Sequence, residues 1–356
     1  MVLLSIVLGA AFAGYADVAA NAGQARVVFS FVIIGCNRVA ASDVSPDNPS
    51  TANLAQLERS FAEIAALRPQ PKIVFFTGDM VMGLTADLGV LRSQLESWVE
   101  EYLSTPLGAD ARVRLIALPG NHESLVGKKG NQTSNPGAED VWLSTMRPYI
   151  AGHNGPGIGG PDNLASEQSE LTYSFNFHHT HFVVVNTDPF GAVATVPVHW
   201  IADDLAKARE RQGIKHIFVL GHKPAFPPPF SSAEQSLNSN PGNRNAFWDE
   251  INAAGVDAYL VAHCHVWDIS RPVSPDDAAA HHVYHVTAGN AGTPLDPLWN
   301  TVEPSPYFGF TVVQIDARNH VTVTSYGRDY DHSNYLAPSP PNVYPTTLRF
   351  SIGLSL

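Results

Sequence analysis

The sequence has little cysteine: only Cys36 and Cys264 occur among its 356 residues. Two cysteines are too few for a scaffold held together by disulfides, so the fold must depend on a hydrophobic core. Charged residues are also sparse, at 15% of the chain, and no run of lysine or arginine occurs. With a net charge of −12, the chain offers no basic surface to a nucleic-acid backbone or an anionic membrane. We therefore expect no nucleic-acid partner, and a small anionic substrate would need positive charge at its own site.

Long apolar runs are absent as well. No segment has the roughly 20 consecutive apolar residues that a membrane-spanning helix needs. The stretch from Val2 to Ala13 is shorter and is followed by small residues, a pattern typical of a secretory signal peptide. The first lysine or arginine is Arg26, so the usual basic segment before the apolar stretch is missing. We interpret residues 1–22 as a candidate signal peptide and expect an exported protein, periplasmic or extracellular. The alternative is a misassigned start or an apolar tail.

The first part of the chain alternates between strand and helix patterns. Val27–Ile34 is β-branched, aromatic and nearly continuous, which predicts a strand buried on both faces. Ser50 or Thr51 can cap a helix whose apolar residues recur at three- and four-residue spacing from position 54 to 64. The next predicted elements are a strand over 72–77, a helix within 84–103 and a strand over 113–118. This order predicts a parallel sheet flanked by helices.

The rest of the chain supplies a second set of elements. The segment at about 126–170 is rich in Gly, Asn, Pro and Ser around one helix pattern at 139–149, which indicates an insertion that covers the site as part of a lid. Beyond it the patterns predict a hairpin (171–177 and 181–186), helices (198–211 and 247–254) and strands (216–220 and 258–262). Three last runs, at 282–288, 308–315 and 321–326, are expected to close a second sheet as antiparallel strands. We expect a single domain over residues 23–356.

Short polar strings follow four of the predicted strands. They are Gly78-Asp79, Gly120-Asn121-His122-Glu123, Gly221-His222 and His263-Cys264-His265. Because the carboxyl ends of parallel strands meet at one edge of a sheet, these side chains are expected to lie close together. A carboxylate, an amide oxygen and several imidazoles suit a divalent metal. The strings therefore favour a shared metal site over the alternative, which is that they are only turn and capping residues.

In this order, the strings resemble the calcineurin-like metallophosphoesterase superfamily. The surroundings of Phe247-Trp248 and of Trp267-Asp268 lean towards its purple-acid-phosphatase-like branch, and the resemblance extends from about residue 27 to 326. It implies an α/β fold, a four-layer α/β/β/α sandwich of two mixed sheets, with the metal site at the carboxyl ends of the strands. It also implies one or two divalent metal ions (zinc, iron or manganese) as cofactor and a small phosphorylated substrate.

The resemblance assigns a role to each string. Asp79 would bridge two metals, Asn121, His222 and His263 would complete the shell of one of them, and His265 would belong to the other. His122 would contact the phosphate and protonate the leaving oxygen as general acid, while metal-bound hydroxide attacks phosphorus. Glu123 is expected to orient a histidine rather than to bind metal. These roles describe a metal-dependent hydrolase, most simply a phosphomonoesterase.

The first motif of the superfamily, Asp-x-His, is altered here to Cys36-Asn37-Arg38. Three interpretations remain open. Cys36 can ligate the second metal as a thiolate, since sulfur suits zinc or iron. Alternatively the site holds one metal, and Arg38 supplies a fixed positive charge to the phosphate. In the third, the protein is a catalytically weak or inactive relative that only binds a ligand. A phosphodiesterase is a further alternative, and the sequence does not indicate the oligomeric state.

Several other residues carry weaker expectations. Asp43 is a candidate replacement ligand, and the loop 288–292 with Asn290 is expected to border the substrate. Met82 stands where purple acid phosphatases have a tyrosine, so no tyrosinate–iron centre is expected. Cys264 is expected to pack on the face opposite to its neighbouring histidines. The histidines outside the strings are expected to be surface or packing residues; they include His178, His179, His181, His281, His282 and His285.

Overall fold

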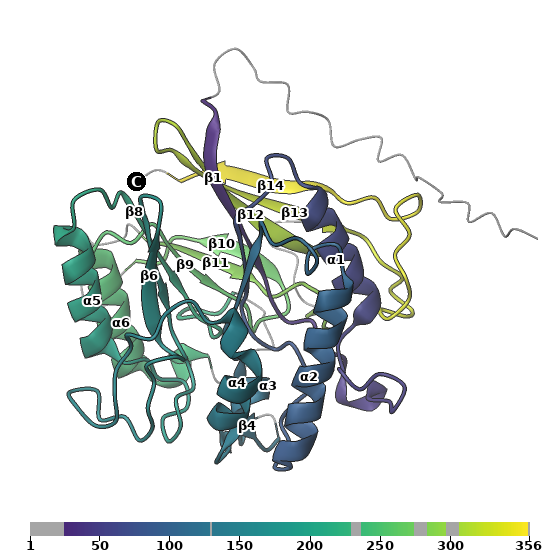
Figure 1. The fold of residues 1–356 in the computed structure, drawn as a ribbon, viewed down its shortest axis with the longest axis horizontal. Coiled ribbons are helices and arrows are strands. Elements are labelled where there is room, and N and C mark those ends of the chain that lie inside the picture. The colour runs from purple at the N-terminus through teal and green to yellow at the C-terminus, as the bar shows by residue number, and fades with distance from the viewer. Residues whose placement is uncertain (1–24, 129, 229–235, 274–282, 297–305, 355–356) are drawn as a thin grey trace, which may run out of the picture.

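The computed structural model describes residues 25–128, 130–228, 236–273, 283–296 and 306–354. The candidate signal peptide lies outside these residues, as do His281 and His282. Two six-stranded sheets pack face to face, and helices cover their outer faces (Figure 1). The predicted four-layer sandwich of two mixed sheets is therefore confirmed. No helix among the described residues has the length and apolar character needed to cross a membrane.

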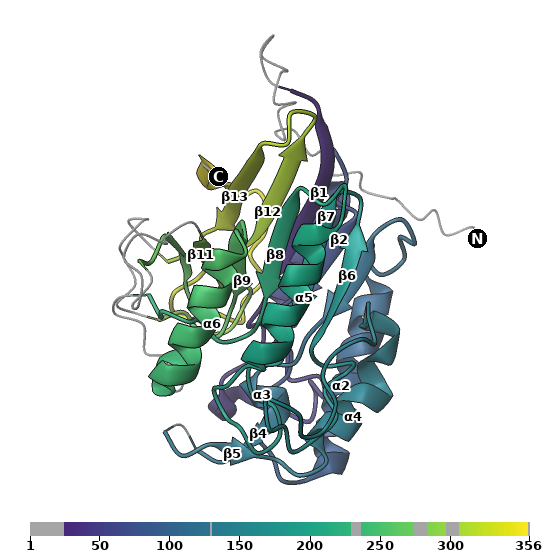
Figure 2. The same ribbon diagram turned by 90° about the vertical axis from the view of Figure 1, so that its left-hand side faces the viewer.

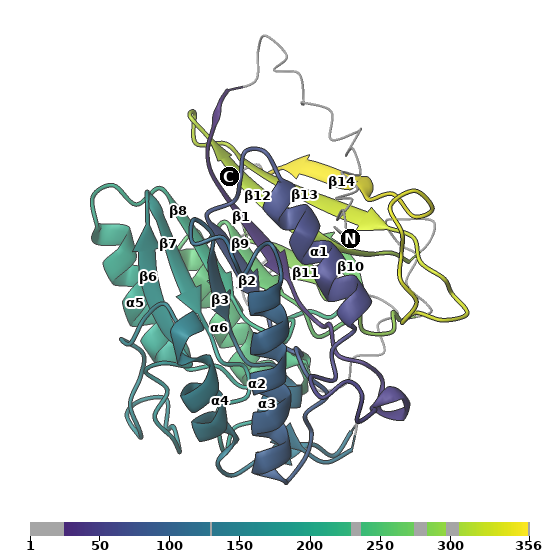
Figure 3. The same cartoon turned by 45° about the vertical axis from the view of Figure 1, so that its right-hand side comes forward.

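The first sheet has the strand order β14-β13-β12-β1-β2-β3. Its strands are β1 (Val27–Ile34), β2 (Ile73–Phe76), β3 (Arg114–Ala117), β12 (Phe308–Asp316), β13 (Val321–Arg328) and β14 (Thr347–Gly353). The first three are parallel, and β12 pairs with β1 antiparallel. Three helices cover this side: α1 (Leu54–Ala66), α2 (Leu88–Ser104) and α4 (Ala138–Met146) (Figure 3).

The second sheet has the order β10-β11-β9-β8-β7-β6. Its strands are β6 (Tyr173–Phe177), β7 (Thr180–Val184), β8 (His216–Leu220), β9 (Ala258–Val261), β10 (Trp267–Ser270) and β11 (Tyr284–Ala288). Helices α5 (Val198–Glu210) and α6 (Pro241–Ala253) cover its outer face (Figure 2). Strands β7, β8, β9 and β11 are parallel, so their carboxyl ends lie at one edge.

Short elements complete the chain. They are β4 (Leu125–Val126) and β5 (Thr133–Ser134), which pair antiparallel, the one-turn helix α3 (Asn121–Ser124), and the 3₁₀ turns Ala41–Asp43, Arg147–Tyr149 and Leu237–Ser239. Three of them, β4, β5 and the turn Arg147–Tyr149, lie in the predicted insertion or at its start.

The expectation that the last three strands close a second sheet antiparallel was wrong. Strands β12 and β13 join the first sheet beside β1, and only β11 joins the second, where it runs parallel to β9. The run over 308–316 is apolar on both faces, as a strand needs to be when it pairs next to the central β1. The strands β10 and β14 were not predicted. Each pairs with the neighbouring strand along the chain, but β10 has only four residues and four of the seven residues of β14 are exposed, so neither leaves a buried apolar run in the sequence.

The side chains of β1 alternate between two parts of the hydrophobic core. Phe29, Phe31 and Ile33 point between the two sheets, whereas Val32 and Ile34 pack beneath the helices of the first sheet. A strand buried on both faces reads as a continuous apolar run, which is what the sequence shows. Between the sheets, the ring of Phe31 lies 5.1 Å from that of Phe218, joining the two layers.

The predicted cap of α1 was also wrong. Asn53 is the N-cap, and its side chain accepts a hydrogen bond from the Gln56 amide. Ser50 and Thr51 lie one turn earlier. The Thr51 hydroxyl accepts from Met82 N at 2.7 Å, so it ties the loop after β1 to the loop after β2.

His285 on β11 gives a prediction about acid stability. The side chain is fully buried, and burial lowers its pKa to about 3. Below pH ~6.5 the unfolded chain takes up a proton there that the folded chain does not, so stability falls as the pH drops from about 6.5 towards 3. His285→Gln, which can still accept from Ala225 N, should remove up to about 1.4 kcal/mol of this loss per pH unit. Urea unfolding of both proteins from pH 7 to pH 4.5 measures it. Parallel pH profiles would contradict the assignment.

Candidate metal centre

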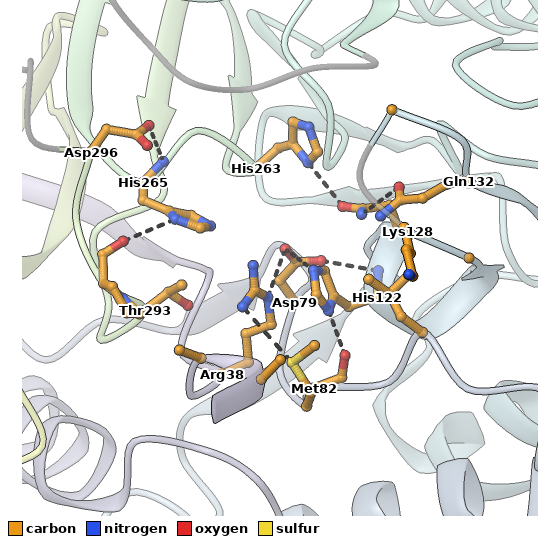
Figure 4. Close-up of a pocket in the computed structure, with 17 residues that line it drawn as sticks. Arg38, Asp79, Met82, His122, Lys128, Gln132, His263, His265, Thr293 and Asp296 are labelled. Carbon is orange, nitrogen blue, oxygen red and sulfur yellow. Dashed lines mark hydrogen bonds and ion pairs between the residues drawn. The ribbon is translucent and has the colours of Figure 1, made fainter. Parts of the chain in front are cut away.

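The strand ends bring the predicted site residues together. Cys36 and Arg38 follow β1, Asp79 follows β2, Asn121 and His122 form α3 after β3, His222 follows β8, and His263 and His265 follow β9. All the candidate residues except Cys36 and His222 line a cavity of about 560 Å³ at this edge, and those two lie buried beside it. Figure 4 shows Asp79 at its centre, with His263, His122, Arg38 and His265 arranged around it.

Four donor atoms converge in this cavity. His222 Nε2 lies 3.1 Å from Asp79 Oδ1, 3.0 Å from Asn121 Oδ1 and 3.1 Å from His263 Nδ1. His263 Nδ1 in turn lies 2.9 Å from Asn121 Oδ1. One carboxylate oxygen, one amide oxygen and two imidazole nitrogens form a donor set suited to a borderline divalent cation.

The hydrogen bonds behind these atoms fix which of them faces the centre. His222 Nδ1 lies 2.7 Å from the carbonyl oxygen of Thr77, so it carries the proton and Nε2 presents its lone pair. That lone pair faces the oxygens of Asp79 and Asn121, which are also acceptors. A divalent cation between these atoms would be bound by all of them, so the residues fit a metal ion.

Electrostatics around Asp79 agree with this arrangement. Burial acts to raise the pKa of Asp79, but His222, His122 and Arg38 together hold it well below its usual value. Burial lowers the pKa of His222, and the Asp79 carboxylate more than offsets this, so the net change is a rise. The carboxylate is therefore ionised and ready to bind a cation.

Gln132 orients Asn121 from the predicted insertion. Its Oε1 accepts a hydrogen bond from Asn121 Nδ2 at 3.0 Å, which leaves Asn121 Oδ1 directed at His222 and His263. A rotation of the Asn121 side chain would exchange its amide oxygen and nitrogen. The hydrogen bond to Gln132 therefore fixes Oδ1 as the atom that faces the metal position.

Gln132→Leu should therefore weaken metal binding about tenfold, as expected for loss of a group that orients a ligand. Gln132→Glu retains an acceptor for Asn121 Nδ2 and should bind metal within about threefold of wild type. Titration of the metal-free protein with Zn²⁺ in a calorimeter measures both. Equal affinities for Gln132→Leu and wild type would contradict the orienting role.

Glu123 does not orient a histidine, which corrects the sequence-based expectation. Its carboxylate accepts from the backbone N–H groups of Asp79 (3.0 Å), Met80 (2.8 Å), Val81 (3.1 Å) and Gly120 (2.7 Å). It therefore holds the loop that carries Asp79 against the loop that carries Asn121. This is a structural role for a buried carboxylate, since each amide would otherwise lack a partner.

The second metal position has a different composition. Cys36, His265 and Asp79 offer ligand atoms within 4.8 Å of one another. Arg38 Nε lies 3.7 Å from Asp79 Oδ2, the oxygen that a second metal would use, and Cys36 Sγ lies 4.0 Å from the same oxygen. The Arg38 Nε atom is buried and makes no hydrogen bond within the described part of the chain. A guanidinium donor is thus directed at this position.

Three site residues adopt the left-handed backbone conformation. The φ angles are 58° at Cys36, 55° at Asp79 and 63° at His263, and each is disfavoured by roughly 1–2 kcal/mol for a residue with a Cβ. Cys36 N donates to Gly78 O at 3.0 Å, which helps to hold two of the turns together. These three strained positions lie at strand ends that carry the candidate ligand atoms, and such strain is common at functional sites.

His122 presents one ring nitrogen to the cavity. Its Nδ1 is hydrogen-bonded to the carbonyl oxygen of Met82, which leaves Nε2 facing inwards, 4.0 Å from Asp79 Oδ2. Burial, followed by the charge of Arg38, lowers the pKa of His122 to about 3. The same two causes lower the pKa of His265 to about 4.

Several weaker expectations are wrong. Asn290 is fully buried, donates to Tyr307 O at 3.2 Å and does not line the cavity. Asp43 accepts from the Tyr335 hydroxyl at 2.7 Å and is not among the cavity residues. Other expectations are confirmed. Cys264 forms no disulfide and packs in the core between the sheets. His285 is a buried packing residue, and His181 is buried against Asp204, with 2.9 Å between Nε2 and Oδ2.

Part of the cavity lining was not predicted from the sequence. The residues that were not predicted include Gln132 and Lys128 from the insertion, and Thr293, Pro294 and Asp296 from the loop after β11. Asp296 Oδ2 accepts from His265 N at 3.3 Å. None of these residues sits in a recognisable motif. Their only signal was position: Lys128 and Gln132 follow closely on Gly120–Glu123, and the loop after β11 lies just beyond the predicted substrate-bordering segment.

Comparison with known proteins agrees with this geometry. Residues 31–267 match the family described as calcineurin-like phosphoesterase. Among curated proteins, none has a sequence that matches this chain significantly.

Solved structures share the fold at low sequence identity. A purple acid phosphatase from yellow lupin (Lupinus luteus) seeds is 20% identical over 85% of this chain, with a TM-score of 0.56, and this chain spans about half of it (52%). A dimetal phosphatase from Danio rerio is 14% identical, with a TM-score of 0.54, and the match covers 85% of this chain and 97% of that one. PhoD is 12% identical, with a TM-score of 0.60, and the match covers 92% and 70%. At these identities, the likeness concerns the fold alone.

Proposed function

We propose that this chain, which belongs to the calcineurin-like phosphoesterase family, hydrolyses phosphomonoesters at a centre built from one divalent metal ion and Arg38. The convergence of Asp79 Oδ1, Asn121 Oδ1, His222 Nε2 and His263 Nδ1 within 2.9–3.1 Å of their neighbours carries the proposal. Family membership supports a metal-dependent hydrolase of phosphoesters with a small phosphorylated substrate.

Each residue of the proposed centre has a distinct role. Asp79, Asn121, His222 and His263 would hold the metal, which when bound would acidify a water molecule and neutralise phosphate charge. Arg38 would bind the phosphate oxygens through its guanidinium, because its buried Nε forms an ion pair with Asp79 Oδ2 at 3.7 Å but makes no hydrogen bond within the described residues. His122 Nε2 faces the same space; the negative charge of a bound phosphate ester raises the pKa of His122, so that Nε2 holds a proton and delivers it to the leaving oxygen. His265 lines the cavity beside Arg38.

The position of Arg38 favours this proposal over a second metal bound by Cys36. A cation at Asp79 Oδ2 would lie next to the guanidinium, whose Nε is 3.7 Å from that oxygen. The two positive charges would repel each other strongly in a buried site. An arginine cannot ligate metal, but its planar fork matches a phosphate.

The function is tested by loading the purified protein separately with Zn²⁺, Mn²⁺ and Fe²⁺ and assaying phenyl phosphate beside diphenyl phosphate. The proposal expects metal-dependent release of phenol, faster from the monoester. Faster cleavage of the diester would replace it with a phosphodiesterase. Phenyl phosphate binding without turnover under every metal would identify a ligand-binding relative.

Variants of Arg38 test the contribution of this side chain to catalysis. Arg38→Ala should lower kcat/KM for phenyl phosphate by about 100-fold or more, because a charged donor to the transferring phosphoryl group is lost. Arg38→Lys should recover only part of this, since an ammonium group lacks the bidentate fork. Metal content by elemental analysis should stay at wild-type level in both. A loss of less than threefold in Arg38→Ala would contradict the role.

A further inference from the structure

Four apolar residues line the cavity, and two of them, Met82 and Leu84, contact His122. Ala40 and Ala41 come from the loop after β1, and Met82 and Leu84 from the loop after β2; we refer to the four as the apolar wall. Arg38 Nη1 lies 4.0 Å from Met82 Sδ, so the two loops meet at this wall. Figure 4 shows Arg38 and Met82 on the same side of Asp79, with Asp296 and Thr293 on another side.

The wall is fixed relative to the inward-facing nitrogen of His122. The Met82 carbonyl oxygen is hydrogen-bonded to His122 Nδ1, and Leu84 N donates to His122 O at 2.9 Å. Between them, a Cβ on Gly83 would lie 1.8 Å from His122 O, so only glycine allows this close packing. The backbone of Met82 and Leu84 is therefore fixed beside His122, whose Nε2 faces the cavity that their side chains line.

The apolar wall has few hydrogen-bond or ionic partners for a polar or charged leaving group. Among the described residues of the cavity, the lysine and arginine side chains are Arg38 and Lys128, and Lys128 is exposed at the rim. Asp296 is hydrogen-bonded to His265 N, across the cavity from Met82. None of the described lining residues is Phe, Tyr or Trp, so a nucleobase would find no ring to stack on. Hydroxyls and charges placed against the apolar wall would lose water without gaining a partner.

We infer that Ala40, Ala41, Met82 and Leu84 form a subsite for an uncharged, apolar leaving group, so the substrates are phosphomonoesters of simple phenols or alkyl alcohols. This inference rests on the proposed function. In the reaction, water adds to phosphorus and loses a proton to solvent. The P–O bond to the leaving group breaks, and its electron pair stays on the leaving oxygen, which takes the proton held on His122 Nε2. His122 then regains a proton from solvent. The products are inorganic phosphate and the alcohol.

The first test compares phenyl phosphate with O-phospho-L-tyrosine on the metal-loaded protein. The two esters break the same aryl–phosphate bond, but phosphotyrosine carries an ammonium and a carboxylate group. The expected result is a kcat/KM at least about tenfold higher for phenyl phosphate. Equal rates, or faster hydrolysis of phosphotyrosine, would overturn the subsite while leaving the proposed function intact. Hydrolysis of neither ester under any metal would instead contradict the proposed function.

The second test changes the wall itself. Ala41 is exposed, so Ala41→Asp is expected to fold, and it should lower kcat/KM for phenyl phosphate at least about fivefold while favouring ethanolamine phosphate over butyl phosphate. Leu84→Asn, close in size to leucine, should lower kcat/KM for phenyl phosphate by about tenfold. Inorganic phosphate has no leaving group, so its inhibition constant should stay within about threefold of wild type in Leu84→Asn. An unchanged preference in both variants would overturn the subsite.

Discussion

Replacing Asp79 by asparagine is expected to lower kcat/KM for phenyl phosphate by at least about 1,000-fold, the largest effect of any single change considered for this site. Asp79 Oδ1 lies 3.1 Å from His222 Nε2, and Oδ2 lies 3.7 Å from Arg38 Nε. Asparagine removes the negative charge that the metal ion and Arg38 need. It also offers an N–H₂ group to one of two positions that require an acceptor.

The loss should be accompanied by loss of metal, because the carboxylate is the one anionic member of the four-atom donor set. Elemental analysis after gel filtration is expected to find less than about a tenth of the wild-type metal in Asp79→Asn, while a negligible change is expected in Asp203→Asn, an exposed carboxylate on α5. Wild-type metal content together with wild-type activity in Asp79→Asn would contradict the assignment.

Glu123→Ala is expected to cost at least about 3 kcal/mol of the free energy of unfolding. The substitution leaves four buried backbone N–H groups without an acceptor, those of Asp79, Met80, Val81 and Gly120. It should also weaken metal binding, since the loop that carries Asp79 would no longer be held. Urea unfolding of the metal-free proteins measures the first effect, and Zn²⁺ titration the second.

Glu123→Gln provides the matched control for size. Its amide oxygen can accept from part of the set, but its N–H₂ group would face donors, so an intermediate loss of stability is expected. If Glu123→Ala and wild type unfolded at the same urea concentration, the carboxylate would not be holding the two loops together.

Much of the fold could be predicted from local pattern. The β1 run from Val27 to Ile34 is apolar at every position but one, and both its faces are buried. Strand β8 begins and ends where its residues predict. The assignment of β12 and β13 could not be made locally, because an antiparallel strand with two apolar faces fits beside any buried strand. Only the whole arrangement shows that β1 has a free edge there.

The candidate site was predictable to the extent that its residues follow strands. Asp79 and His222 are far apart in sequence, yet each ends a parallel strand, so topology alone brings them together. The role of Glu123 was not predictable, because a carboxylate next to histidines gives no sign that its partners are backbone amides. Gln132 was missed for a similar reason: its contact with Asn121 depends on how the insertion folds back, and no periodicity encodes that path.

The proposal to be tested is that one metal ion and Arg38 do together what two ions would do if both metal positions were filled. Elemental analysis of the purified protein and of Cys36→Ser, each after incubation with excess Zn²⁺ and gel filtration, tests it most directly. The account predicts one metal ion per chain in both proteins, with phenyl phosphate activity retained in Cys36→Ser. Two tightly bound ions per chain in the wild-type protein, falling to one in Cys36→Ser, would contradict it.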